Sequence, residues 1–250
     1  MFTRPAPAAH RTGTRSPLTD RNAVSVQSQT PFVVAHRAGN DLRRLRAAEA
    51  RGVTYVEADV RLFRGRRVDV RHGRRLGRLP VVYDEGRLLR AGKPFTLDDL
   101  LAEAAPRTGL LLDLKGRDTR LSEEVLDAMA PHLGRRPLAV CARAWSLLEP
   151  FRGEPHLRLV PSVGSPRELS AFLAGSSSTP ASAVSVRDSL VDAPTVRSLR
   201  TRAGTVVCWT VNCSRRAAQL ASWGVDGITT DAVEGVASAV HPDRYVLRAA

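Results

Sequence analysis

Two acidic side chains lie one position apart inside a segment whose pattern predicts a buried β-strand. Glu57 and Asp59 alternate with apolar residues throughout residues 54–62. Because successive side chains of a strand point to opposite faces, both carboxylates should point the same way. Burying such a pair is costly unless a cation or a proton compensates the charge. The pattern favours a divalent-metal site, and an exposed edge strand with an Arg61 ion pair is the alternative.

A second predicted strand ends in another carboxylate and in a rare lysine. Within residues 109–116, Asp113 and Lys115 share one face of the strand, and leucines occupy the other face. The chain therefore has a third acidic residue in the same kind of setting as the first two, with a cation beside it.

Two histidines and an arginine end two further extended runs. His36 and Arg37 follow a short apolar strand pattern, and His72 ends the run that begins at Val68. Ionisable groups at the C-terminal ends of consecutive strands, each followed by a loop and a helix pattern, are typical of an α/β active site. One histidine in such a place is more often structural, but two of them beside three carboxylates favour catalysis.

Six motifs follow one another along the chain: His36-Arg37, Glu57-Ala-Asp59, His72, Asp113-Leu-Lys115, Cys208-Trp-Thr-Val-Asn212 and Gly224-Val-Asp-Gly-Ile-Thr-Thr-Asp231. Their order and spacing resemble those of the glycerophosphodiester phosphodiesterase family, within the phosphatidylinositol phospholipase C-like phosphodiesterase superfamily. The resemblance covers residues 31–235. It implies a single-domain (β/α)8 TIM barrel of the α/β class and a phosphoric diester hydrolase.

Several positions depart from the pattern of that family. Ala38 stands where the family usually has a glycine, the usual Glu-Asn-Thr triplet is missing, and Gly73 replaces the aspartate that usually follows the second histidine. Asp113 stands where a glutamate is common. The short first loop with Asn40, and the spacing of Asp113 and Lys115, are similar to the sphingomyelinase D branch of the superfamily.

The resemblance implies that Glu57, Asp59 and Asp113 hold one divalent cation, Mg2+ or Ca2+, through oxygen ligands. Zinc fits less well, because the three cysteines include no Cys-x-x-Cys pair and the histidines lack helical spacing. The expected cofactor is therefore one hard cation.

The resemblance also implies roles for the remaining residues. His36 and His72 would act as general acid and base, in an order that the sequence does not assign. Arg37 and Lys115 would bind the phosphate. Trp209 would pack against the glycerol or alcohol portion, with a core tryptophan as the alternative.

The rest of the chain fits eight strand and helix units. Strands are expected at 32–36, 54–62, 109–115, 138–142, 157–161, 183–186, 205–211 and 227–230. Helices are expected at 41–51, 96–105, 121–133, 145–152, 166–174, 193–202, 214–223 and 232–240, with a β-rich excursion over 68–84. Arg143, at the end of the fourth strand, is a further candidate phosphate ligand. Residues 31–250 are long enough for one such barrel, and residues 1–30 are expected to form a disordered basic tail.

The chain carries a formal charge of +13 and a pI near 11.1, which would ordinarily suggest nucleic acid or an anionic membrane. Only Lys93 and Lys115 among its 38 basic residues are lysine, so the arginine content reflects a coding bias. Because the arginines are scattered and aromatics are few, nucleic acid is disfavoured, and weak association with anionic membranes stays open.

The expected localisation follows from the apolar content of the sequence and from its cysteines. Residues 1–30 lack the apolar run of a secretory signal, and no segment of the sequence is long and apolar enough to cross a bilayer. Three unpaired cysteines fit a reducing compartment, so we expect a cytoplasmic protein. The sequence does not indicate an oligomeric state.

Three functions remain in view. The first is a phosphodiesterase that releases glycerol phosphate and an alcohol from small glycerophosphodiesters. The second is a phospholipase D-type enzyme acting on lysophospholipid or sphingolipid, as the short first loop suggests. The third is a non-catalytic relative that binds phosphoesters, as Ala38 and Gly73 suggest. A narrow polar mouth would favour the first function, and an exposed apolar rim would favour the second.

Overall fold

The computed structural model describes residues 30–63, 65–76, 79, 81–90, 92, 95–175 and 181–241. The tail expected over residues 1–30 lies outside the described residues, apart from Thr30. Its disorder therefore stays a prediction, as does the assignment of residues 31–250 to one domain.

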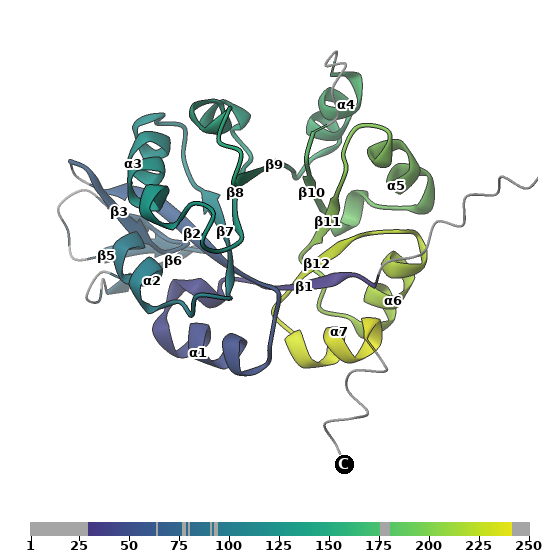
Figure 1. The fold of residues 1–250 in the computed structure, drawn as a ribbon, viewed down its shortest axis with the longest axis horizontal. Helices are drawn as coiled ribbons and strands as arrows, with labels where there is room; N and C mark the ends of the chain where they lie inside the picture. The colour runs from purple at the N-terminus through teal and green to yellow at the C-terminus, as the bar shows by residue number, and fades with distance from the viewer. Residues whose placement is uncertain are drawn as a thin grey trace, which may run out of the picture.

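Within the described residues, eight parallel strands close into a barrel (Figure 1). Closure follows because the first strand pairs in parallel with both the last and the second strand. The TIM barrel expected from the sequence is confirmed. The strands are β1 (Phe32–Ala35), β2 (Tyr55–Phe63), β7 (Gly109–Leu114), β8 (Leu138–Ala142), β9 (Leu157–Val163), β10 (Val184–Arg187), β11 (Val206–Trp209) and β12 (Gly227–Thr230).

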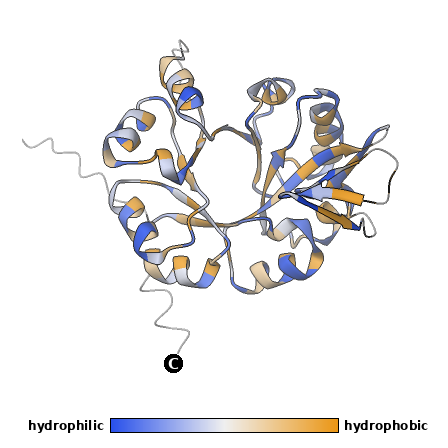
Figure 2. Cartoon of the chain, turned by 180° about the vertical axis from the view of Figure 1, so that it is seen from behind, coloured by the Kyte–Doolittle hydropathy of each residue, from blue (hydrophilic) through white to orange (hydrophobic). Residues whose placement is uncertain are grey.

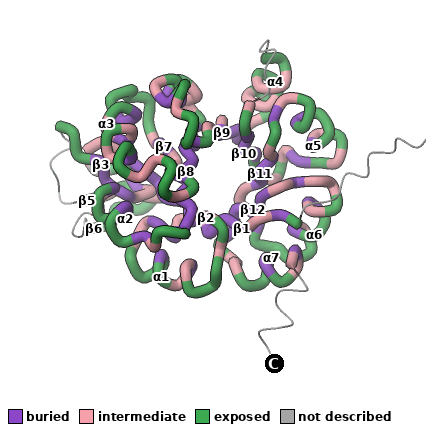
Figure 3. The backbone as a smooth tube through the Cα atoms, in the orientation of Figure 1, coloured by how far each residue is buried: buried purple, intermediate pink, exposed green. Residues whose placement is uncertain are grey.

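Helices surround this barrel, and most of them have exposed outward faces and buried inward faces (Figure 3), whereas the helix at Pro166–Ala174 has no buried residue. A capping box is present at Thr96, since its hydroxyl accepts from the backbone N–H of Asp99 and the Asp99 carboxylate accepts from the backbone N–H of Thr96. The helices are α1 (Leu42–Ala50), α2 (Leu97–Glu103), α3 (Arg120–Met129), α4 (Pro166–Ala174), α5 (Ala193–Arg200), α6 (Ser214–Ser222) and α7 (Val233–Val240). Short 3-10 segments are η1 (Ala38–Asn40), η2 (Ala130–His132), η3 (Trp145–Phe151) and η4 (Asp188–Leu190).

The fourth unit differs from the expectation of a helix over residues 145–152. The segment forms the 3-10 helix η3, which contains Pro150. A proline has no backbone N–H and its ring crowds the preceding turn, so it disfavours a regular α-helix in so short a segment.

A small antiparallel sheet stands beside the barrel, where a β-rich excursion was expected. β3 (Arg67–Val70) folds back on the end of β2, and the chain then forms β4 (Arg74–Arg75), β5 (Val81–Asp84) and β6 (Arg87–Arg90). We call β4 to β6 the hairpin sheet. The hairpin sheet extends past residue 84, where the expected excursion ended, because the turn after β5 leads directly into β6. The sequence did not predict β6, because its two adjacent leucines lack the alternation typical of a strand.

The inside of the barrel is apolar directly below the strand ends. Val34, Leu111, Ala139, Val160 and Ala183 form a buried cluster there. Leu111 precedes Asp113 by two positions, so it lies below that carboxylate on the same face of β7. This apolar layer forms the floor on which polar side chains of the next layer rest.

Candidate active site

Seven of the eight site residues expected from the sequence line one cavity of about 270 Å³ at the C-terminal ends of the barrel strands. They are His36, Arg37, Glu57, His72, Asp113, Lys115 and Trp209. The eighth, Asp59, is buried and contacts Arg37 and Lys115. Arg143 also lines the cavity. The structure therefore brings together residues that are far apart in the sequence.

The three carboxylates lie together. Glu57 and Asp59 share one face of β2, and Asp59 lies directly opposite Asp113 in the parallel pairing of β2 with β7. One oxygen from each carboxylate lies within 4.8 Å of the others. Glu57 is 5% exposed and Asp59 only 1%, so solvent does little to screen their repulsion. The edge-strand alternative is wrong, because β2 is an interior strand of the barrel.

Specific hydrogen bonds hold two of these carboxylates in place. Asn40 donates through Nδ2 to Asp59 Oδ2 at 2.7 Å, and its Oδ1 accepts from the backbone N–H of Asp59 at 2.9 Å. The backbone of Arg37 lies in the left-handed region with φ of 52°, and in that conformation its N–H donates to Glu57 Oε2 at 2.6 Å. Asn40 was noted in the sequence for its place in a short loop, and its contact with Asp59 was not foreseen.

Two of the three carboxyl groups resist ionisation where they lie, so a bound cation would stabilise their charged forms. Burial raises the pKa of Glu57 well above its ordinary value, and the carboxylates of Asp59 and Asp113 raise it further. Burial also raises the pKa of Asp113. Burial opposes ionisation of Asp59 as well, but the Lys115 ammonium and hydrogen bonds from Lys115 and Asn40 outweigh it, so the pKa is lowered.

Lys115 is the cation closest to the acidic cluster. Its Nζ lies 2.8 Å from Asp59 Oδ1 and also pairs with Asp113. Burial opposes its charge, yet Asp113, Asp59 and Glu57 together raise its pKa above the ordinary value. Lys115 and the Arg37 guanidinium beside Asp59 supply two positive charges for three carboxylates, two of which are buried, so this all-oxygen donor set fits a hard divalent cation.

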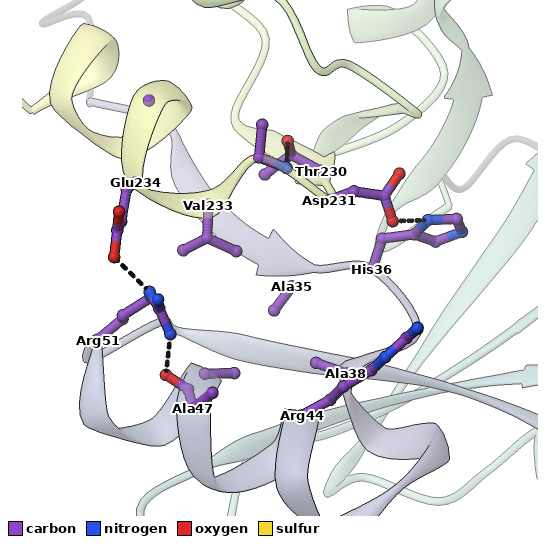
Figure 4. Close-up of a pocket in the computed structure, with 13 residues that line it drawn as sticks. Ala35, His36, Ala38, Arg44, Ala47, Arg51, Thr230, Asp231, Val233 and Glu234 are labelled. Atoms are coloured by element: carbon purple, nitrogen blue, oxygen red, sulfur yellow. Dashed lines mark hydrogen bonds and ion pairs between the residues drawn. The ribbon is translucent and has the colours of Figure 1, made fainter.

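His36 is held by a carboxylate from the neighbouring strand end (Figure 4). Its Nδ1 donates to Asp231 Oδ1 at 2.8 Å, which leaves Nε2 for proton transfer. Asn212 fixes Asp231 in turn, since its Nδ2 donates to Oδ2 at 3.0 Å and its Oδ1 accepts from the Asp231 backbone at 2.9 Å. Both residues belong to motifs seen in the sequence, where they were given no role.

His72 is held by a carboxylate from the hairpin sheet. Its Nδ1 donates to Asp84 Oδ1 at 2.5 Å, and its backbone carbonyl accepts from Arg61 Nε at 2.9 Å. A Cβ on Gly73 would lie 2.3 Å from Val82 Cγ1 and 2.8 Å from Asp84 Cβ, so only glycine lets the two strands approach this closely. The β-rich excursion expected over residues 68–84 includes Asp84, but the sequence gave no sign of this contact.

Two further side chains border the same cavity. Trp209 ends β11, and its buried Nε1 has no hydrogen-bond partner among the described residues. Arg143 pairs with Glu168 at 2.8 Å and lies against Gly164, so its charge is partly offset. Trp209 thus has an indole N–H available for a substrate oxygen, whereas Arg143 is already engaged.

A second cavity, of about 610 Å³, lies between α1 and α7 and shares His36 with the first (Figure 4). Ala35, Ala47 and Val233 form part of its apolar lining. At its edge Arg51 pairs with Glu234 at 2.7 Å. His36 therefore belongs to the walls of two cavities.

The second half of the barrel matches a known family. Residues 135–235 match the sequence model of the Glycerophosphoryl diester phosphodiesterase family. This segment contains Trp209, Asn212 and Asp231, and it begins after the three carboxylates and both histidines of the site. A comparison with curated proteins finds no match.

Solved structures match over most of the chain. A putative glycerophosphoryl diester phosphodiesterase from Silicibacter pomeroyi is 19% identical with a TM-score of 0.67, over 84% of this chain and 93% of that one. A phosphodiesterase from Oleispira antarctica, solved with its product sn-glycerol-3-phosphate, is 19% identical with a TM-score of 0.68, over 84% and 97%. A glycerophosphodiester phosphodiesterase from Thermotoga maritima is 21% identical with a TM-score of 0.63, over 82% and 96%.

At this level of identity the solved structures establish a shared fold, and the match to residues 135–235 adds a family signature in the sequence itself. The resemblance drawn from the sequence is thereby confirmed: residues 135–235 carry the signature of the glycerophosphodiester phosphodiesterase family, and the chain has the TIM-barrel fold of solved structures bearing that name.

Proposed function

We propose that this protein hydrolyses small glycerophosphodiesters to glycerol 3-phosphate and an alcohol. The observation that carries the proposal is the meeting of three carboxylates, two carboxylate-held histidines and two cations around one cavity of about 270 Å³. The Oleispira antarctica phosphodiesterase, which shares the fold, holds the product sn-glycerol-3-phosphate. That product is the one expected from such a reaction.

Glu57, Asp59 and Asp113 would hold the expected Mg2+ or Ca2+, because these cations prefer carboxylate oxygens. When bound, such a cation supplies Lewis-acid polarisation of a phosphate oxygen. The protein keeps these ligands in place through Asn40 and through the backbone of Arg37.

The remaining chemistry belongs to side chains of the protein. His36 and His72 exchange protons with the attacking and leaving oxygens through Nε2, because Nδ1 of each ring is held by a carboxylate. Arg37 and Lys115 bring positive charge to the phosphate as negative charge develops on it. Arg37 is itself oriented by Glu85, whose carboxylate accepts from its Nη1 at 2.7 Å.

The lining of the cavity favours a small polar substrate. Apart from Leu111, Cys141 and Trp209, the lining residues are polar or charged. A phospholipase D-type activity on lysophospholipid is the second candidate, favoured by exposed leucines on the neighbouring hairpin sheet. A purely binding role is less consistent with the structure, because both histidines are positioned as proton-transfer groups are.

A panel of four substrates tests the proposal: glycerophosphocholine, glycerophosphoethanolamine, lysophosphatidylcholine and sphingomyelin. Each is assayed with Mg2+, with Ca2+ and with a chelator. We expect metal-dependent release of glycerol 3-phosphate from the two glycerophosphodiesters. Choline release from lysophosphatidylcholine, with no activity on glycerophosphocholine, would establish the second candidate. Binding of glycerol 3-phosphate without any turnover would establish a non-catalytic relative.

A further inference from the structure

Large apolar side chains are exposed mainly on one part of the described surface. Five such residues are more than 40% exposed, and four of them lie between residues 79 and 89, in or beside the hairpin sheet. Leu88 is 65% exposed and Tyr83 is 49% exposed, and the hairpin sheet is rich in apolar residues in Figure 2. A local concentration of this kind marks an interaction surface more often than scattered single residues do.

The strand register places Tyr83 and Leu88 on one face of the hairpin sheet, whereas Leu89 lies opposite Val82 on the other face. Tyr83 lies opposite Arg74 on one side and opposite Leu88 on the other, so the three form a row across β4, β5 and β6. The neighbouring residues Val82 and Asp84 point to the opposite face, where they pack against Gly73. The row therefore faces away from the barrel, and we call it, with Arg90, the outer face.

Arginines flank the apolar residues of the outer face. Arg74 and Arg90 are exposed, and Arg90 shares the face because it lies opposite Val81, two positions from Tyr83. In the part of the chain that the structure describes, neither arginine forms an ion pair with a carboxylate. The two acidic residues of the same turn are engaged elsewhere, Asp84 with His72 and Glu85 with Arg37. The outer face is thus apolar and positively charged.

We propose that the outer face of the hairpin sheet docks on the surface of an anionic lipid bilayer. Tyrosine favours the interfacial region of a bilayer, leucine inserts its apolar side chain at the boundary with the acyl chains, and arginines beside them are attracted to anionic headgroups. The net charge of +13 adds to that attraction. A second copy of this chain fits less well, because a two-fold interface would gather the arginines of both copies in one buried surface, and the described residues of the outer face include no carboxylate to compensate them.

Docking in this way has a consequence for the active site. The strand that carries Tyr83 on its outer face carries Asp84 on its inner face, and Asp84 holds His72. The docked protein would therefore have its catalytic cavity next to the membrane. The proposal does not depend on the reaction, because binding to lipid is measured without turnover.

The test is binding of the full chain to two kinds of vesicle, one of phosphatidylcholine alone and one with about one-third phosphatidylglycerol. We expect binding mainly to the anionic vesicles. Leu88→Ser should weaken it about three- to tenfold, the loss expected for one partly inserted leucine. Leu42→Ser, which removes an exposed leucine from α1, is the matched control and should change nothing.

A second pair of variants separates a local surface from simple charge attraction. Arg74→Gln with Arg90→Gln should weaken binding about tenfold or more. Arg167→Gln with Arg197→Gln removes the same charge from exposed positions on α4 and α5 and should have a much smaller effect. Equal losses from both pairs, or no loss from Leu88→Ser, would overturn the proposal. A dimer that Leu88→Ser converts to a monomer in sedimentation would show that a second copy is the partner, which would also overturn it.

Discussion

The two histidines of the site are held by the same chemistry in two different structural settings. His36 follows β1, and its partner Asp231 follows the adjacent barrel strand β12. The backbone N–H of His36 also donates to the carbonyl of Thr230, the last residue of β12, at 2.9 Å. His72 follows β3, and its partner Asp84 comes from the hairpin sheet outside the barrel. One pair is part of the closed barrel, whereas the other depends on how an appended sheet packs.

The two settings differ in the contacts that fix the partner carboxylate. Asp231 is fixed by Asn212 and by the strand that precedes it, so several contacts hold His36 in place. Asp84 reaches His72 only because Gly73 allows β5 to come close. We therefore infer that Asp84 takes the place of the aspartate that usually follows the second histidine. An aspartate at residue 73 would occupy the space that Asp84 fills.

The largest expected effect comes from a carboxylate that holds neither histidine. Glu57→Gln removes a charge from the proposed metal-binding cluster while keeping an acceptor for the Arg37 N–H, and it should reduce turnover to background. Because it relieves repulsion among buried carboxylates, the stability of the metal-free protein should be unchanged or raised. Thermal unfolding in chelator measures this. A large fall in the unfolding temperature would show that Glu57 is a structural ion-pair partner instead.

The histidines themselves should show the next largest effects. His36→Ala and His72→Ala should each lower kcat by roughly two to four orders of magnitude, the range for a positioned acid or base. The losses should not multiply in the double variant, because the two groups act in one reaction. Steady-state kinetics on the best substrate provides the measurement. If His72→Ala kept nearly full turnover while His36→Ala was inactive, another group would have to perform the second proton transfer.

The partner carboxylates should have smaller effects than the histidines. Asp231→Asn and Asp84→Asn should each lower kcat by about 10- to 100-fold, with KM nearly unchanged, because they orient a ring and do not contact substrate. Arg120 pairs with Asp118 on the exposed surface, so Asp118→Asn is a control for loss of one surface carboxylate. A rise in KM with kcat preserved would instead place either aspartate in substrate binding.

The smallest expected effect tests the close packing at Gly73. Gly73→Ala would place a methyl group against Val82 and Asp84, so it should displace the hairpin sheet and lower kcat by about tenfold or less. The unfolding temperature should hardly change, because the hairpin sheet lies outside the barrel. Gly92→Ala is the matched control, since a Cβ at that position would meet no atom within 4 Å. Equal kinetics for both variants would show that the approach of β5 does not matter for His72.

Much of the barrel and of the site could be predicted because the relevant signals are local. Alternation in residues 54–62 and 109–116 correctly placed Glu57, Asp59 and Asp113 on inward faces, and parallel strands bring their C-terminal ends together. The expected boundaries of β8 and α4 also agree with the structure. Periodicity and strand direction are enough for these features.

The partners of the histidines could not be predicted in the same way. Asp84 reaches His72 through the packing of the hairpin sheet, which depends on tertiary contacts that no short sequence pattern records. Asp231 lies far from His36 in sequence, and only closure of the barrel makes them neighbours. Gly73 looked like a lost carboxylate because its role is to leave space, and a sequence does not show which side chain fills that space.

A double-variant cycle tests most directly whether Asp84 acts through His72. Kinetics would be compared for the wild type, Asp84→Asn, His72→Ala and the combination of both. If Asp84 acts only by orienting the His72 ring, Asp84→Asn should lower kcat in the wild-type background and have no further effect once His72 is removed. An equal loss from Asp84→Asn in both backgrounds would contradict this account, because it would mean that Asp84 acts independently of the histidine it holds.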